Sequence, residues 1–387
     1  MKKVIIIFLI TILIICGCSM QKKTDEIRAV WVSYIDYTQI LWGKTQSEFE
    51  KAADEIMENC SEYNINTIYL HASAFTDAYY DSKYYPTQYI GKEIGADLSY
   101  DPLRIFVKKA HDKNIRIEAW INPFRSFDQK KMEDVPDDYI VKQWVNEGNR
   151  NVIFYKDRYY LNPAYQDVHD LILNVVEEIV ENYDIDGIHM DDYFYPDHVD
   201  NSFDLKDYQK TDQTISIEDW RRNNVNELVK AISQRLSKMD GNLILGISPA
   251  GNLEYSRDSI FGDVETWVKE EWVDYIAPQI YFGYTNKSRP FSETLKQLSN
   301  IVEGTNVEMI VGLGAYKINQ KNGNSDDEEW ISDQQILKKQ ILESKDASNY
   351  RGYALYSYHS MFRANEEDTQ AVMKQLEELK ERSEGNE

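Results

Sequence analysis

The sequence predicts a (β/α)8 TIM barrel, an α/β fold, with its long loops gathered on one face. Eight short apolar runs recur along the chain, and a segment with helical periodicity follows each of them. The links from helix to strand are short, whereas several links from strand to helix are long, and in a barrel the latter lie on the face that carries chemistry. No shift in composition marks a second domain, so we expect one barrel over residues 27–382.

The elements follow from these runs in order. We expect strands at residues 27–33, 67–71, 116–121, 187–190, 243–248, 275–280, 309–313 and 352–355. Among the amphipathic segments between them, the clearest helices are at residues 47–59, 102–113, 167–182, 219–238 and 334–345, with Asp101 as an N-cap. The long rim links are expected at residues 72–100, 122–166, 192–218 and 314–332.

The N-terminus predicts export. Lys2 and Lys3 precede an apolar run from residue 4 to residue 16, which is shorter than the roughly 20 residues of a membrane-spanning helix but typical of a signal peptide. The run ends in Ile-Cys-Gly-Cys, which resembles the bacterial lipobox. That resemblance implies a signal peptide over 1–17, lipidation of Cys18, a tether over 18–26 and an extracytoplasmic protein held at the cell membrane; an uncleaved anchor is the alternative. Residues 383–387 read as a polar tail.

The charge and the cysteine content limit the partners and the covalent bonds that this protein can have. The chain has 66 acidic and 43 basic residues, a formal charge of −23, which argues against a nucleic-acid partner because phosphates need a basic face. Besides the cysteines of the export segment, Cys60 is the only thiol, so no intramolecular disulfide is available and it is most simply a packing residue. No cofactor is implied.

Strand parity selects candidate residues. In the fourth strand Ile188 and Met190 face the helices, so His189 and Asp191 point into the barrel near its C-terminal mouth. A carboxylate at this position is hard to explain by a structural role alone, since burying an unpaired carboxylate costs roughly several kcal/mol. Asp191 is therefore the principal functional candidate. Asp192 follows at the strand exit, where a turn or capping role is an equal alternative.

The same parity applied to the other strands gives further candidates. In the third strand Glu118 points inward as a second carboxylate, for which pairing with Arg116 is as good an interpretation as catalysis. After the fifth strand, a tight turn brings its backbone close to a ligand and is followed by an acid. The remaining inward or strand-end candidates for substrate binding are His71, Trp120, Asn122, Asn252, Glu254, Gln279 and Tyr281.

Mixed amide, carboxylate and aromatic side chains at strand ends are typical of a carbohydrate site, because sugars offer hydroxyls for hydrogen bonds and apolar faces for rings. Aromatic residues make up 13% of the chain and concentrate in the rim segments. Individually most can be packing residues, but together they predict platforms on which sugars stack. They are Tyr79, Tyr80, Tyr84, Tyr85, Tyr89, Tyr155, Tyr159, Tyr160, Tyr193, Phe194 and Tyr195.

Six motifs in one order resemble the glycoside-hydrolase-like 10 family of bacterial envelope proteins. They are EIRAVWVSY, INTIYLHASAF, IRIEAWINPFR, DGIHMDDYFYP, LILGISPAGN and APQIYFGY, and the likeness spans nearly the whole chain after the tether. The resemblance implies a barrel hydrolase that acts on glycosidic bonds, with peptidoglycan glycan strands as the target.

A more distant similarity is to the family 18 chitinases, whose fourth strand carries DGxDxDxE. Asp186 and Asp191 match the first and third acids of that pattern. His189 replaces the second acid, and Tyr193 stands in the place of the proton-donating Glu. The chitinase mechanism therefore cannot be transferred to this chain.

Glycoside cleavage needs one group that protonates the leaving oxygen and another that stabilises or attacks the developing cation. Asp191 is expected at the centre, as nucleophile or as the residue that orients a substrate acetamido group. Its partner acid stays open between Asp192, Glu118 and Glu254, while His71 and His189 are expected to tune the protonation of Asp191.

Two other functions remain open. The first is a glycan-binding lipoprotein without catalysis, because the partner acid is not identified. The second is a metal-dependent hydrolase, which the scattered His71, His189 and Asp191 make the weakest possibility, so no metal is expected.

Overall fold

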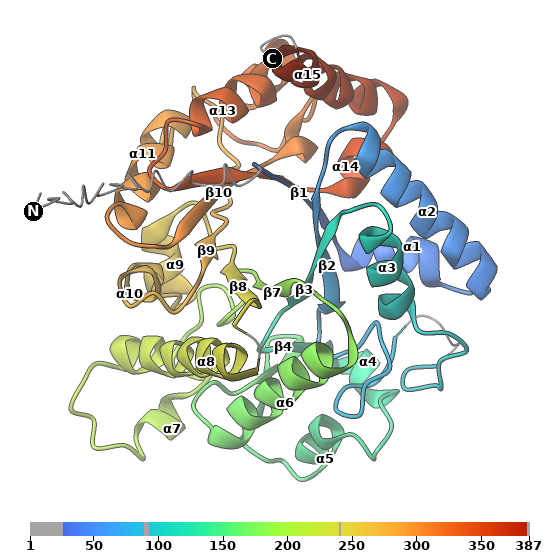
Figure 1. The fold of residues 1–387 in the computed structure, drawn as a ribbon. Coiled ribbons are helices and arrows are strands. Elements are labelled where there is room, and N and C mark those ends of the chain that lie inside the picture. The colour runs from blue at the N-terminus through green and yellow to red at the C-terminus, as the bar shows by residue number, and fades with distance from the viewer. Residues whose placement is uncertain (1–25, 89–92, 240, 385–387) are drawn as a thin grey trace, which may run out of the picture.

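The computed structural model describes residues 26–88, 93–239 and 241–384. Eight parallel strands close into a barrel in the order β1-β11-β10-β9-β8-β7-β3-β2, which confirms the predicted fold (Figure 1). The blue N-terminal strand and the red C-terminal strand lie side by side, because β1 pairs with β11. The barrel strands are β1 (Ile27–Val32), β2 (Thr67–Ser73), β3 (Arg116–Ile121), β7 (Gly187–Met190), β8 (Ile244–Ile247), β9 (Tyr275–Ile276), β10 (Glu308–Leu313) and β11 (Tyr350–Leu355).

Helices surround the barrel. The longer ones are α2 (Gln46–Glu62), α3 (Pro102–His111), α6 (Gln166–Asn182), α8 (Ile217–Met239), α11 (Phe291–Val302), α13 (Ile336–Ser344) and α15 (Glu366–Glu384). Five of them, α2, α3, α6, α8 and α13, match the expected segments within a few residues, and α15 continues two residues into the segment expected as a tail. Asp101 caps α3 as predicted, since its side chain accepts a hydrogen bond from the backbone N–H of Arg104.

The long links after the strands contain further short elements. The link after β3 holds a three-stranded antiparallel sheet in the order β4-β6-β5. The short strands are β4 (Arg125–Asp128), β5 (Val152–Tyr155) and β6 (Arg158–Leu161). The short helices are α1 (Tyr34–Leu41), α4 (Gln129–Glu133), α5 (Ile140–Asn146), α7 (Leu205–Tyr208), α9 (Leu253–Ser259), α10 (Val264–Lys269), the 3-10 turn η1 (Ala315–Lys317), α12 (Asp327–Ser332) and α14 (Tyr358–Phe362).

The sixth barrel strand is shorter than predicted. Only Tyr275 and Ile276 belong to β9, although residues up to 280 were expected in it. Pro278 lacks the N–H that a strand ladder needs, and single bridges then join Gln279 to Ala250 and to Gly312. The neighbouring segments therefore still hold this part of the chain in the barrel wall.

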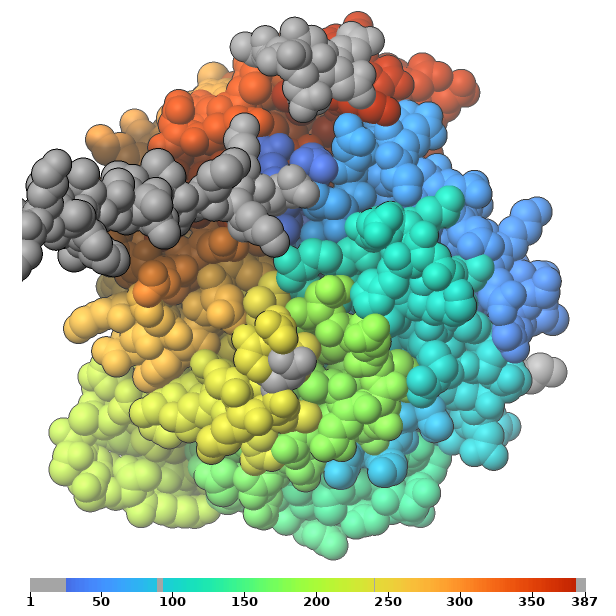
Figure 2. All heavy atoms as spheres, viewed as in Figure 1, coloured from blue at the N-terminus to red at the C-terminus, as the bar shows by residue number. Residues whose placement is uncertain are grey.

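The core has two parts. A large outer cluster fills the layer between strands and helices, and it includes Ile188 and Met190 as strand parity predicts. A smaller cluster fills the barrel interior and includes Trp31, Tyr69 and Tyr275. In the space-filling view, side chains cover the middle of the face that Figure 1 shows as a ring of ribbons (Figure 2). The barrel is thus a packed core, as is general for this fold.

No helix in the described part of the chain is long and apolar enough to cross a membrane. The expected signal peptide, Cys18 and nearly all of the tether fall outside the described residues.

Candidate functional site

A cavity of about 340 Å³ opens where the strands end, and both adjacent aspartates line it. Its wall is formed by residues at the ends of β1, β2, β3, β7, β8, β9 and β11, together with the first turn of α1, the start of β4 and the turn η1. They are Trp31, Ser33, Tyr34, Ile35, His71, Trp120, Asn122, Arg125, Asp191, Asp192, Tyr193, Ser248, Gln279, Tyr281, Tyr316 and Tyr356. Twelve residues were predicted from the sequence to be catalytic or to bind substrate.

 Eight of these twelve line the wall, and Glu118, His189, Asn252 and Glu254 do not.

Asp191 lies just beyond the end of β7, with its side chain almost fully buried and facing the cavity. One carboxylate oxygen accepts a hydrogen bond from the backbone N–H of Tyr193 at 3.1 Å. Burial and then the neighbouring charge of Asp192 raise the pKa of Asp191 well above its usual value, and Arg125 lowers it by a smaller amount. Asp191 therefore holds a proton far more readily than an exposed aspartate does.

Asp192 is half-buried and lines the same cavity. Burial raises its pKa to about 6, against the lowering effect of a hydrogen bond from the Gln279 side chain. Gln279 is itself held in place, because its amide nitrogen donates to the carbonyl of Ser248 at 3.0 Å. The two carboxyls therefore influence each other's protonation, and the first proton binds preferentially to Asp191.

His71, Trp120 and Asn122 form one side of the wall. The rings of His71 and Trp120 are stacked, and the indole N–H donates to the Asn122 side-chain oxygen at 3.1 Å. The Nδ1 atom of His71 accepts the backbone N–H of Tyr34 at 3.0 Å, which assigns its ring proton to Nε2. Burial holds the pKa of His71 well below its usual value, so the ring is neutral and acts as a hydrogen-bond donor.

Glu118 and His189 point inward as predicted, but both lie below the cavity. His189 Nε2 accepts the Trp31 indole N–H at 3.1 Å, and its Nδ1 bonds the Tyr275 hydroxyl at 2.7 Å. That hydroxyl donates to Glu118 at 2.5 Å, and Arg116 lies 3.7 Å from the other Glu118 oxygen. The assignment of Glu118 as catalytic is corrected: it ends a buried hydrogen-bond chain inside the barrel. His189 does not line the cavity.

The turn after β8 also differs from expectation. Asn252 caps α9, where its side chain accepts the N–H of Tyr255 at 3.1 Å, and Glu254 is exposed on that helix away from the cavity. A Cβ on Gly251 would lie 2.5 Å from the carbonyl oxygen of Gln279, so this turn approaches the next strand end and not a ligand. Both residues are therefore removed from the set of cavity residues.

The predicted aromatic platforms are largely wrong. Of the described rim aromatics, only Tyr193 lines the cavity; Tyr79, Tyr80, Tyr85, Tyr155, Phe194 and Tyr195 are buried in the core. Long rim links need their own hydrophobic packing, and these rings supply it. Tyr89 lies outside the described residues.

Other aromatic residues line the cavity in their place. The first strand and its exit provide Trp31 and Tyr34, η1 provides Tyr316, and Tyr356 follows β11. Strand parity could have found Trp31, which alternates with Ala29 toward the interior. Arg125, at the start of β4, had no such signal, because it lies beyond the strand where alternation ends.

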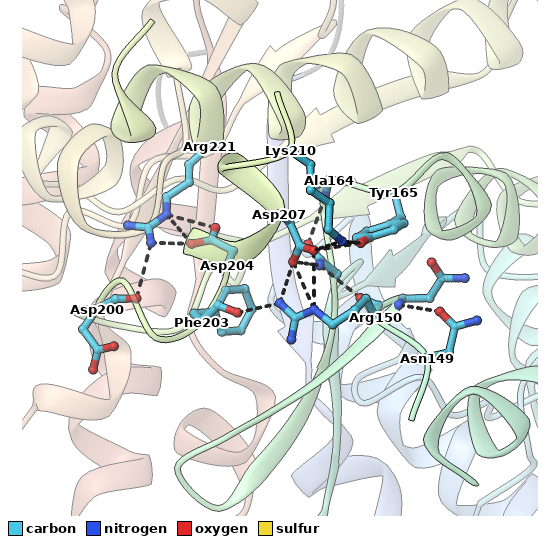
Figure 3. Close-up of polar contacts among 12 residues, drawn as sticks. Asn149, Arg150, Ala164, Tyr165, Asp200, Phe203, Asp204, Asp207, Lys210 and Arg221 are labelled. Carbon is cyan, nitrogen blue, oxygen red and sulfur yellow. Dashed lines mark hydrogen bonds and ion pairs between the residues drawn. The ribbon is translucent and has the colours of Figure 1, made fainter. Parts of the chain in front are cut away.

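A network of ion pairs fixes the link between β7 and α8 that begins at the two aspartates (Figure 3). Asp207 accepts hydrogen bonds from Arg150 at 2.5 Å and from the Tyr165 hydroxyl at 2.8 Å, and Lys210 lies at 3.0 Å. These partners lower the pKa of Asp207 to about 2 despite its burial. The link is thereby tied to the insertion after β3.

A second pair lies in the same link. Asp204 is fully buried and bonds Arg221 of α8 at 2.5 Å, while Arg221 also donates to the carbonyl of Asp200 at 3.3 Å (Figure 3). The carboxylate and the guanidinium thus compensate each other's charge inside the protein. Both pairs together anchor the segment that carries Asp191 and Asp192.

A metal site from His71, His189 and Asp191 does not fit this geometry. Both ring nitrogens of His189 are already used by Trp31 and Tyr275. Within the described ranges, no group of three or more His, Cys, Asp or Glu side chains is arranged to hold a metal ion.

Comparison with known proteins finds relatives that are named glycosyl hydrolases. The chain is 29% identical over 345 residues to "Glycosyl hydrolase YngK" of Bacillus subtilis (strain 168), covering 82% of this chain and 65% of that protein. It is 25% identical over 361 residues to "Glycosyl hydrolase DigH" of Escherichia coli (strain K12), covering 83% and 80%. The chain therefore spans less than two thirds of the YngK relative.

Two solved structures share the barrel. The PgaB (BpsB) glycoside hydrolase domain from Bordetella bronchiseptica matches with a TM-score of 0.60 and 16% identity, covering 91% of this chain and 99% of that one. Alpha-L-fucosidase isoenzyme 2 from Paenibacillus thiaminolyticus matches with a TM-score of 0.58 and 15% identity, covering 92% and 49%. At these identities the likeness shows the fold alone.

A family model described as "Glycosyl hydrolase-like 10" matches residues 26–332, which is most of the chain and contains every residue of the cavity except Tyr356. The family description and the names of the relatives support a glycosidase-like function. The chain belongs to the glycosyl hydrolase-like 10 family.

Proposed function

We propose that the protein is a glycoside hydrolase that cleaves peptidoglycan glycan strands, with Asp191 and Asp192 as its acid pair. The observation that carries the proposal is two adjacent carboxyls with raised pKa values in one cavity walled by aromatic rings and amides. Of the three candidate partners for Asp191, only Asp192 lines that cavity, which favours it over Glu118 and Glu254.

The pair supplies the two protonation states that the reaction needs. A glycosidase needs one protonated carboxyl to donate to the leaving oxygen and one carboxylate to stabilise the positive charge that develops on the sugar. Asp191 is the carboxyl that keeps its proton more readily, because it is the more deeply buried of the two, and Asp192, with a pKa of about 6, is the carboxylate. Asn122, Gln279 and the neutral His71 then orient the sugar through its hydroxyl or acetamido groups.

The proposed place of action is the cell envelope. The resemblance of the N-terminus to a lipobox supports anchoring through Cys18, which would hold the barrel outside the cytoplasm near the wall. A peptidoglycan substrate is consistent with that position.

The decisive experiment incubates purified, metal-free protein with peptidoglycan glycans, with and without stem peptides, and analyses the products. Wild type should release glycan fragments, and Asp191→Asn should reduce the rate by about 10²- to 10⁴-fold, the usual effect of losing an acid–base group. EDTA should leave the rate unchanged. Binding without any product from wild type would instead support a non-catalytic glycan-binding protein, and a loss of activity in EDTA would support metal chemistry.

A further inference from the structure

Arg125 brings a positive charge into a cavity whose other ionisable wall groups are acidic or neutral. It begins β4, and its guanidinium lies 4.8 Å from the centre of the Phe75 ring and 4.5 Å from that of Tyr193. The two rings hold the planar group between them by cation–π contacts. The guanidinium is thus positioned before any ligand arrives.

The charge has no acidic partner. In the described part of the chain, Arg125 forms no ion pair, although the molecule carries 66 acidic residues. It lowers the pKa of Asp191 only by an amount smaller than the effects of burial and of Asp192, so it is not bonded to that carboxyl. Ring faces do not use the N–H groups at the edge of a guanidinium, which carries five donors in a fixed fork.

A half-buried cation with free donors in a binding cavity is suited to a carboxylate, which accepts two parallel hydrogen bonds from that fork. We propose that Arg125 is a specificity-determining residue that binds a carboxylate carried by the substrate sugar. The inference rests on the proposed function only in that a glycan occupies this cavity. The carboxylate could belong to the lactyl ether of a muramic acid residue or to a uronic acid, and the two sources share this chemistry.

The experiment measures binding, so it does not depend on turnover. Asp191→Asn protein is titrated by calorimetry with four oligosaccharides of similar length: peptide-free peptidoglycan glycan, the same glycan with its carboxyls reduced to alcohols, a neutral chitooligosaccharide and an oligouronate. The carboxylate-bearing glycan should bind about ten- to a hundredfold more tightly than its reduced form, as for a hydrogen bond to a charged group. Tighter binding of the oligouronate instead would identify the second source.

Matched variants in the Asp191→Asn protein test whether the preference for the carboxylate depends on Arg125. Arg125→Gln should abolish the preference for the carboxylate, and Arg125→Lys, which keeps the charge without the fork, should restore part of it. Arg158→Gln is the control, because Arg158 stacks on the same Phe75 ring at 4.9 Å without lining the cavity, and it should keep the full preference. Thermal melts of all variants verify that they are folded.

Equal affinity for the carboxylate-bearing and reduced glycans would overturn the inference, and so would an Arg158→Gln effect as large as that of Arg125→Gln. Either result leaves the proposed hydrolase intact if wild type still cleaves glycan. Conversely, an Arg125-dependent preference in a protein that cleaves nothing would sustain the inference and refute the proposed activity.

Discussion

At the scale of single residues, the acid pair links protonation to the position of Gln279. The Gln279 side chain lowers the pKa of Asp192, and Ser248 fixes its amide. Below its pKa of about 6, Asp192 takes up a proton, and the carboxylate that stabilises the developing cation is lost. We therefore expect kcat/KM to fall as pH decreases through about 6.

Gln279→Leu should move this acidic limb to higher pH, because the ionised form of Asp192 loses a hydrogen bond. A shift of about half to one pH unit is expected, equivalent to roughly 1 kcal/mol for that bond. The measurement is the pH profile of kcat/KM for both proteins between pH 4 and 8. A limb that stays in place would show that Asp192 is not the group that titrates.

Glu118 allows the opposite prediction. Glu118→Gln should keep more than about a third of wild-type activity, far from the loss of 10²-fold or more expected for a catalytic acid, because it lies below the cavity. Burial raises its pKa to about 7, above an unfolded value of about 4.3, so ionising it in the folded state costs stability as pH rises between these values. The melting temperature of Glu118→Gln relative to wild type should therefore rise from pH 5 to pH 8.

The alternation of residues along a strand predicted which side chains point into the barrel, but it could not predict how far each one lies below the open end. Glu118, Trp120 and Asn122 all point inward from one strand, yet only the last two reach the cavity. The strands are staggered by their tilt, so residues of equal position along different strands lie in different layers of the interior. The side chains that fill each layer decide which one opens to solvent, and a single sequence does not contain that information.

At the scale of elements, buried ion pairs hold the link from β7 to α8, which contains little regular structure. The link from β7 to α8 has only the four-residue α7 within it, and Asp207 at that helix joins it to Arg150 and Tyr165 (Figure 3). The position of the long links on one face of the barrel was predicted from the distances between the expected strands and helices. Their buried charge pairs were not, because the partners are as many as 57 residues apart.

Asp207→Asn should lower the free energy of unfolding by about 2 to 3 kcal/mol at pH 7, since it removes charge-assisted hydrogen bonds from a buried carboxylate. The folded-state pKa of about 2 lies below the unfolded value of about 3.9, so this stabilisation is present above pH 4 and disappears as pH falls toward 2.

Denaturant unfolding at pH 7 and at pH 3 tests this, with Asp212→Asn, an exposed acid of the same link, as the control. A difference between Asp207→Asn and wild type that does not shrink at pH 3 would contradict the assignment.

At the scale of the whole molecule, all eight strands and their order around the barrel could be predicted from the spacing of apolar runs. The cause is that parallel strands covered on both faces are apolar throughout, and each needs a crossover helix. The end of β9 was the exception, where Pro278 removes a ladder bond. The proposed anchoring of the chain to the membrane does not follow from the barrel fold.

Cys18→Ser should release the protein from the membrane fraction, because a lipid chain on that residue is the proposed anchor. Fractionation of cells that express each form, followed by immunoblotting, measures the distribution. Cys16→Ser is the matched control and should remain membrane-bound. Retention of Cys18→Ser would show that the apolar segment itself stays in the membrane as an uncleaved anchor.

Cys60, expected as a packing residue, is fully buried in α2, and burial raises its pKa far above that of a free thiol. Thiolates are the form that reacts with maleimides, so this site is inert while the protein stays folded. A shortened form that begins after Cys18 can therefore take a fluorophore at one engineered cysteine, for instance in place of the exposed Phe154, without background labelling.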